Sequence, residues 1–243
     1  MFNKITTVLC FALLSGCQSL PVDTINESAS QEQNNDNDDS SYFQIANVTK
    51  NNNVISFDGG MSFEANEQVK KLIDSQTTSL QIRSRGGEIN AGMELAELIY
   101  KHKLNVEVKD YCFSSCANYV FPAGKTKVLS ANSLLGWHGG ALQEDDDFEE
   151  LLSPEEQKAF ESYIVAARER EKRLFRDIGV KQSITILGQS DKYDRYQDCI
   201  GWNYSLAALD KLGVKNIKLK DGKWQPATSF NDNCLFTIGE QEL

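Results

Sequence analysis

The chain of 243 residues contains no run of eighteen apolar residues, so it lacks the segments from which a multi-pass membrane protein is built. Basic residues are also scarce, because 25 Lys and Arg face 35 Asp and Glu and leave a formal charge of −10. This excess of negative charge disfavours a protein that neutralises phosphates, so we expect no nucleic-acid partner. Only four prolines are present, and 40% of the residues are hydrophobic, so the chain is expected to form one globular domain.

Familiar cofactor patterns are missing as well. Gly86-Gly87 lacks the Gly-x-Gly-x-x-Gly spacing of dinucleotide-binding turns, and the chain has no Walker motif. Two histidines far apart and one close cysteine pair do not form a zinc ligand set. The sequence therefore predicts neither a cofactor nor a bound metal.

Residues 1–16 have the three parts of an export signal: a basic residue near the start, an apolar run over residues 5–14, and two small residues. The run is too short to span a bilayer as a stable anchor. Its end, Leu14-Ser15-Gly16-Cys17, resembles the lipobox of bacterial lipoproteins, which implies a lipidated Cys17 that anchors the protein to a membrane. Gln18 then implies sorting to the outer membrane, facing the periplasm. The alternative is an ordinary signal peptide that is cut elsewhere.

Residues 17–44 are expected to form a lipidated, disordered tether. They are rich in Ser, Asn and Asp, and such a segment cannot bury enough apolar area to offset the entropy of ordering it. A calcium loop is the alternative, but the turn glycine and the spaced glutamate of an EF-hand are missing. Residues 45–243 are predicted to be the folded domain.

Within residues 45–243, short β-rich runs alternate with stretches of helical periodicity. This alternation argues for ββα or βαβ units and hence for an α/β domain. The acidic run 144–150 precedes a predicted helix N-terminus, where negative charge is favourable, and this explanation is preferred over a metal site. Strands are predicted at 54–57, 79–83, 105–108, 127–129, 134–137 and 214–219, and helices after Ser62, after Gly87, and at 114–120, 153–175, 183–187 and 204–212.

Four cysteines lie in the predicted domain: Cys112, Cys116, Cys199 and Cys234. An even number of cysteines in an oxidising compartment favours disulfides. Of the three possible connectivities, Cys112–Cys116 with Cys199–Cys234 is preferred. Two small buried thiols at positions 112 and 116 are the alternative.

One group of residues has the components of nucleophilic acyl transfer, which needs a nucleophile, a base and backbone donors for the developing oxyanion. Gly86-Gly87 lie at a strand-to-helix turn, where the backbone can approach a ligand. Ser114 and Ser115 begin a helix of small residues, so the amide of Cys116 is a second candidate donor. His138 follows a strand, and histidine is the usual base at neutral pH.

The order of these residues resembles a known family. Arg83–Gly87, Phe113–Ala117 leading to Ala123-Gly124, and Asn132-Ser133 leading to Trp137-His138 resemble the Clp protease proteolytic subunit and the wider Clp protease/crotonase superfamily. The resemblance is best over residues 53–140. It implies a single-domain α/β fold of repeated ββα units. The cysteines on either side of the serines resemble an exported branch of the superfamily.

In that family the nucleophilic serine lies eight residues before an Ala-Gly pair, which here identifies Ser115. The resemblance therefore implies that Ser115 is the nucleophile and His138 the general base, with the amides of Gly87 and Cys116 as oxyanion donors beside Gly86. Ser114 is the fallback nucleophile, because a short shift of the turn would exchange the two serines.

The third member of a catalytic triad is left open. The family pattern favours Asp198, which lies seven residues before Ser205, and Asp194 and Asp191 compete with it. A plain surface carboxylate is the alternative for Asp198. Arg85 stands where the family has proline, and His102 is expected to be exposed at the end of a helix.

The sequence thus predicts a periplasmic, membrane-anchored serine hydrolase, in particular a peptidase that acts on peptides or unfolded proteins. By resemblance it is also expected to form a homo-oligomer. One alternative is a non-catalytic binding or scaffold lipoprotein that keeps the fold. Another is a crotonase-like enzyme for acyl thioesters, but export argues against it because coenzyme A thioesters are cytoplasmic metabolites.

Overall fold

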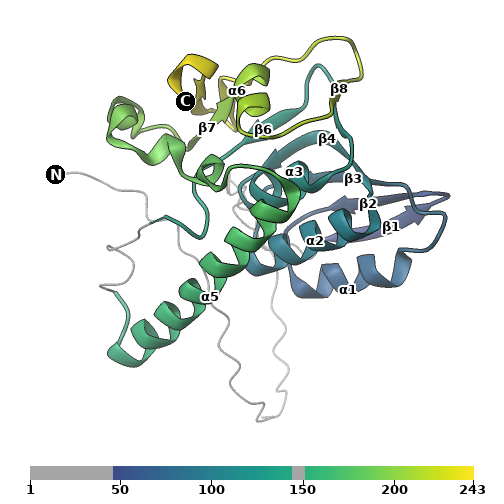
Figure 1. Ribbon diagram of the computed structural model, residues 1–243, viewed down its shortest axis with the longest axis horizontal. Coiled ribbons are helices and arrows are strands. Elements are labelled where there is room, and N and C mark those ends of the chain that lie inside the picture. The colour runs from purple at the N-terminus through teal and green to yellow at the C-terminus, as the bar shows by residue number, and fades with distance from the viewer. Residues whose placement is uncertain (1–45, 144–150) are drawn as a thin grey trace, which may run out of the picture.

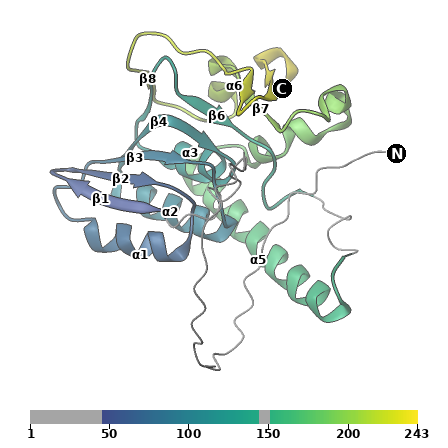
Figure 2. The same ribbon diagram turned by 180° about the vertical axis from the view of Figure 1, so that it is seen from behind.

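The computed structural model describes residues 46–143 and 151–243 (Figures 1 and 2). The predicted signal 1–16, the lipidation site Cys17, the tether 17–44 and the acidic run 144–150 lie outside the described residues. Within the described ranges, no helix has both the length and the apolar character needed to cross a membrane.

The described chain is a single α/β domain built on a seven-stranded sheet, which confirms the predicted fold class. The strand order is β1-β2-β3-β4-β5-β8, and β6 pairs with the far end of β4. β1 and β2 form an antiparallel hairpin, and the other pairs of this sheet are parallel. The strands are β1 (Asn47–Asn51), β2 (Val54–Asp58), β3 (Ser79–Ser84), β4 (Asn105–Phe113), β5 (Lys127–Leu129), β6 (Leu134–Gly136) and β8 (Ile217–Leu219).

The helices form mainly where apolar periodicity and capping residues predict them. In Figure 1, α1 and α2 lie against the sheet, and α5 runs beside α2 with its first turns projecting away from the body. Ser153 and Glu156 form a capping box at the start of α5, as the sequence predicts. The helices are α1 (Phe63–Leu72), α2 (Ile89–His102), α3 (Phe121–Ala123), α5 (Pro154–Ile178) and α6 (Leu206–Lys211).

A second sheet of three strands, in the order β7-β10-β9, follows the main one and was not predicted. Its strands are β7 (Gly201–Tyr204), β9 (Ser229–Phe230) and β10 (Asn233–Ile238). The prediction of a helix over 204–212 was wrong at its start, because Tyr204 ends β7. The helix begins after Ser205, whose Oγ accepts a hydrogen bond from the Ala208 amide. The predicted strand 214–219 is likewise shortened to β8.

The two sheets are joined at the segment that carries His138. Trp137 and Trp202 exchange two backbone hydrogen bonds of 2.8 Å, which form an isolated antiparallel bridge between the end of β6 and β7. Both indole rings are buried in the core. The small sheet is therefore fixed directly beside the predicted base.

Candidate active site

Three parallel strands end at one place and position the candidate residues. Gly86-Gly87 follow β3, Ser114 follows β4, and His138 lies two residues after β6. In the β4–β6 ladder Phe113 pairs with Gly136, and the Ser114 amide donates to the Gly136 carbonyl at 2.9 Å. Because the carboxyl ends of parallel strands meet at the same edge of a sheet, segments far apart in the sequence converge here.

Ser114 and His138 are in direct contact. Ser114 Oγ lies 2.6 Å from His138 Nε2, within hydrogen-bond distance. Ser114 has a φ of +57°, in the left-handed region that residues with side chains rarely adopt. A sharp turn of this kind between a strand and a helix points a hydroxyl out of the backbone, as in the nucleophile turns of serine hydrolases. The pair has the geometry that a nucleophile and its general base require.

Ser115 does not occupy the position predicted for it. Its hydroxyl donates to the Gly87 carbonyl at 2.9 Å, and its side chain is buried. The structure therefore contradicts the pairing of Ser115 with His138. Between Ser114 and Ala123 lies η2 (Cys116–Val120), a π-helix, and a π-helix holds one residue more per turn than an α-helix.

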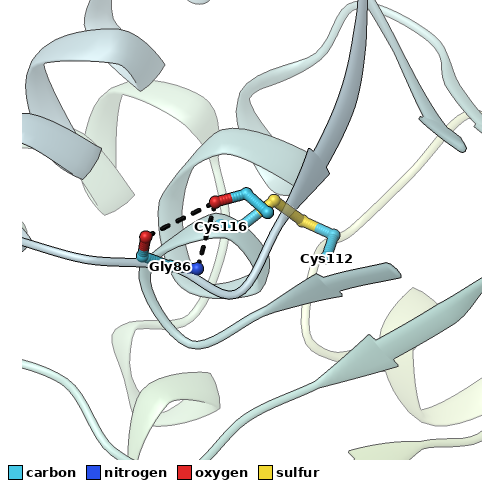
Figure 3. Close-up of a disulfide and its surroundings, with 4 residues drawn as sticks. Gly86, Cys112 and Cys116 are labelled. Carbon is cyan, nitrogen blue, oxygen red and sulfur yellow. Dashed lines mark hydrogen bonds between the residues drawn. A yellow bond between two sulfur atoms is a disulfide. The ribbon is translucent and has the colours of Figure 1, made fainter. Parts of the chain in front are cut away.

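The Cys112–Cys116 disulfide encloses this turn, with a Cα–Cα distance of 5.2 Å. Figure 3 shows Gly86 next to it. The second disulfide, Cys199–Cys234, joins the segment before β7 to β10, so the preferred connectivity is confirmed. The covalent link restricts the conformations open to residues 112–116, and it also leaves Cys116 without a free thiol.

Gly86 and Gly87 bring a second piece of backbone against Ser114. At Gly86, with a φ of +102°, a Cβ would lie 2.6 Å from the Ser114 Cβ, so no other residue fits without a shift. The Gly86 amide donates to Ser84 Oγ at 3.1 Å. Within the described part of the chain, no hydrogen bond engages the amides of Gly87 and Ser115. Backbone amides without a partner are the kind of donor that an oxyanion hole needs.

His138 is held in a desolvated, neutral environment. Its ring stacks on Phe113, with centroids 5.3 Å apart and planes 5° from parallel. Burial lowers the pKa of His138 to about 4, and burial is the one cause of this shift. Nε2 can therefore accept the Ser114 proton at neutral pH, although an imidazole with a lowered pKa is a weak base.

The predicted acid is not assembled with this pair. Asp198 is exposed in the turn that follows η5 (Asp191–Tyr196), and Asp191 is exposed at the start of η5. Asp194 borders the same cavity as His138. No hydrogen bond or ion pair joins any of the three carboxylates to His138 in the described residues. What the structure brings together is a Ser–His pair.

The loop after His138 is instead held through its backbone, by residues that the sequence did not single out. Gln189 Nε2 donates to the His138 carbonyl at 3.1 Å. Asn118 Nδ2, from η2, donates to the Gly139 carbonyl at 2.6 Å. The helix that follows Ser114 is thus bonded directly to the loop that carries the base.

Glu171 of α5 also links η2 to the loop after His138. Its fully buried carboxylate accepts hydrogen bonds from Tyr119 Oη (2.8 Å), the Ala141 amide (3.1 Å) and Gln182 Nε2 (2.7 Å). Burial raises the pKa of this carboxyl. Helical periodicity alone did not distinguish it from the exposed glutamates of α5, because its partners come from three other segments.

The chain is similar to several solved protein structures. No protein-family model and no curated protein matches the chain. ClpP1 from Listeria monocytogenes is similar at 20% identity and a TM-score of 0.43, over 70% of this chain and 92% of that chain. An enoyl-CoA hydratase from Thermoplasma volcanium is 14% identical with a TM-score of 0.31, over 39% of this chain and 52% of that chain.

A methylmalonyl CoA decarboxylase is similar to the same extent, at 11% identity and a TM-score of 0.30, over 38% of this chain and 47% of that chain. The chain therefore spans about half the length of each of these two CoA enzymes. The roles assigned to individual residues below rest on the contacts within this chain.

Proposed function

We propose that the protein is a serine hydrolase with Ser114 as nucleophile and His138 as general base, acting on peptides or unfolded proteins. The observation that carries the proposal is the 2.6 Å contact between Ser114 Oγ and His138 Nε2 at a turn enclosed by a disulfide. His102 is exposed at the end of α2, which leaves His138 as the one histidine of the chain placed at this turn.

In this mechanism Nε2 of His138 removes the Ser114 proton while Oγ attacks the substrate carbonyl. The amides of Gly87 and Ser115 stabilise the oxyanion of the tetrahedral intermediate. The imidazolium then donates the proton to the leaving amine. A water molecule, deprotonated by the same nitrogen, attacks the acyl carbon; the bond to Ser114 Oγ breaks, and the imidazolium returns the proton to Oγ.

The environment of His138 sets a limit on the rate. Each pKa unit corresponds to about 1.4 kcal/mol, so forming an imidazolium whose pKa is about 4 rather than 6.5 costs up to about 3 kcal/mol more. A cost of this size slows the chemical step by about 100-fold relative to an ordinary histidine. We therefore expect a slow hydrolase.

The proposal extends to the location of the enzyme. Residues 1–17 resemble a lipoprotein signal, and two disulfides suit an oxidising compartment. Together they support an exported protein, anchored through lipid on Cys17 in the outer membrane and facing the periplasm. Self-association into a homo-oligomer is implied by the sequence resemblance and belongs to the same proposal.

Covalent labelling tests the assignment. Full-length protein in detergent is treated with a fluorophosphonate, and intact mass reports the adduct. We expect one adduct on the wild type, none on Ser114→Ala, and a strong loss on His138→Gln. Ser115→Ala is the matched control, because it removes the neighbouring hydroxyl but leaves the contact with His138; it should keep the adduct.

Labelling of Ser114→Ala together with loss of labelling in Ser115→Ala would return the nucleophile to Ser115. The same spectra report whether both disulfides are intact, so a misfolded variant is recognised.

A second function remains, a binding or scaffold lipoprotein that keeps the fold without the reaction. The observation in its favour is that no carboxylate is hydrogen-bonded to His138 among residues 46–143 and 151–243. This function predicts no adduct on folded, oxidised wild-type protein. It also predicts that Ser114→Ala has the phenotype of the wild type in cells, whereas deletion of the gene does not.

A further inference from the structure

A cavity of about 210 Å³ opens beside His138. Its walls come from η4 (Leu187–Gln189), from η5 and from strands β7 and β10, which belong to the part of the chain after α5. Pockets that hold a whole small-molecule ligand measure about 300–1,000 Å³. The volume therefore suits one large side chain of a longer substrate.

Part of the cavity wall is aromatic and is held by contacts within the chain. Tyr193, Trp202 and Phe236 line it, and the Phe236 ring stacks on Tyr196 with centroids 4.5 Å apart. Cys199 also lines the cavity, and its disulfide to β10 holds this wall to the small sheet. Rigid rings of this kind suit the methylene stem of a long side chain or the face-on approach of a cation.

The charge of the cavity has one sign. Of the described residues that line it, Asp194 is the one acidic residue, and none is a lysine or an arginine. The Asp194 side chain is exposed, and within the described ranges no hydrogen bond or ion pair joins its carboxylate to His138 or to a basic residue. That carboxylate is left available to a cation on the ligand.

Two cations of η5 lie over tyrosine rings of the cavity wall. Lys192 Nζ is 5.4 Å from the centroid of the Tyr193 ring and donates to the Glu242 carbonyl. Arg195 Cζ is 4.7 Å from the centroid of the Tyr196 ring. Neither residue is among those that line the cavity.

We propose that this cavity is the specificity pocket of the site and that it takes a lysine or arginine side chain of a peptide substrate. The aliphatic stem lies against the rings of Tyr193, Trp202 and Phe236, and the cationic head group pairs with Asp194. This inference rests on the proposed hydrolase function and names its substrate class. It also separates Asp194 from the role of triad acid, because the carboxylate acts on the ligand and not on His138.

The test uses diphenyl phosphonate probes that differ in one side chain: lysine-like, leucine-like or glutamate-like. With full-length protein, the lysine-like probe should label at least about 10-fold faster than the leucine-like probe, and the glutamate-like probe slowest. Asp194→Asn should slow the lysine-like probe about 10-fold and leave the leucine-like probe unchanged. Asp191→Asn, an exposed carboxylate of the same helix that does not line the cavity, is the matched control and should change neither rate.

A uniform loss of rate with all three probes in Asp194→Asn would overturn the proposal, because it would place Asp194 in the catalytic machinery. If the lysine-like and leucine-like probes label the wild type at equal rates, the proposed pocket specificity is also overturned. The hydrolase function would still hold in that case, because both probes form adducts.

A binding measurement keeps the pocket testable if no probe reacts at all. N-acetyl-lysine amide is added to Ser114→Ala, and the NMR signal of the Trp202 indole N–H is followed. A shift that N-acetyl-norleucine amide does not reproduce, and that Asp194→Asn weakens about 10-fold, supports the pocket. No shift at all would refute it independently of the chemistry.

Discussion

The neutral, buried state of His138 makes the stability of the protein depend on pH. Burial lowers the pKa of His138 to about 4 in the folded chain, whereas an unfolded histidine titrates near 6.5. Between these two values the unfolded chain binds a proton that the folded chain does not bind, so the free energy of unfolding falls as the pH falls from 6.5 to 4. Below pH 4 both states carry the proton, and the histidine contributes no further change.

The size of the effect follows from the shift. Between pH 7.5 and pH 4.5 a group with these two pKa values loses up to about 2.5 kcal/mol of stability. The His138 side chain is half-buried, so solvent screening reduces the expected loss to about 2 kcal/mol. This is a large part of the stability of an ordinary domain.

Urea denaturation at several pH values measures the effect. Carboxylates also titrate in this range, so the informative quantity is the difference in free energy of unfolding between wild type and His138→Gln at each pH. We expect this difference to change by about 2 kcal/mol from pH 7.5 to 4.5. His102→Gln, at the exposed second histidine, is the matched control and should follow the wild type. A difference that stays constant with pH for His138→Gln would show that His138 is not held neutral, and the reasoning would fail.

Three further predictions concern the same site. The rate of fluorophosphonate labelling should be constant between pH 6 and 8 and fall to half its maximum near pH 4, because His138 stays neutral down to about that pH. A rate that is half-maximal at about pH 6.5, as for an ordinary histidine, would contradict this prediction. Gly86→Ala should abolish labelling and destabilise the fold by about 1–3 kcal/mol in denaturation. Gly222→Ala is the control, because Gly222 also has a positive φ, of +70°, but no described atom lies within 4 Å of the added Cβ; it should leave labelling intact. Glu171→Ala should destabilise by about 2–4 kcal/mol and slow labelling, because it leaves two buried donors and the half-buried Gln182 amide without an acceptor. Glu171→Gln should recover part of both effects, and Glu169→Ala, on the exposed face of the same helix, should show neither.

The core of the fold was predictable because its signals are local. The β2, β3, β4 and β5 segments are short β-rich runs, and the capping box before α5 is a pattern of four residues. The small sheet was missed because its strands pair with partners 30 residues or more away, as β7 does with β10, or are only two residues long, as β9 is. The segment Gly201–Tyr204 alternates small or polar residues with aromatic ones, but it is only four residues long, and this short pattern did not distinguish it from the helix that follows.

The sequence predicted the residues of the candidate site but not which of the two serines contacts His138. Residue types and chain order identified the glycine turn, the pair of serines and His138. The prediction of Ser115 came from the family spacing before Ala123-Gly124, whereas in the structure Ser114 contacts His138 and a π-helix, η2, lies between the serines and that pair. The acid could not be identified from spacing either, because the residues that hold the His138 loop act on its backbone and leave no sequence pattern.

This backbone support gives a physical reason why a Ser–His pair can hold its geometry without a carboxylate on the imidazole. In a triad the acid orients the base through the second ring nitrogen and stabilises the imidazolium. Here the orientation comes from other contacts: Gln189 and Asn118 hold the carbonyls of His138 and Gly139, and Phe113 stacks on the ring. These contacts fix position but supply no negative charge, which agrees with a pKa that burial alone lowers. Orientation and electrostatic stabilisation are therefore separated in this site, and a ligand that buries His138 further without bringing a negative charge would weaken the base still more.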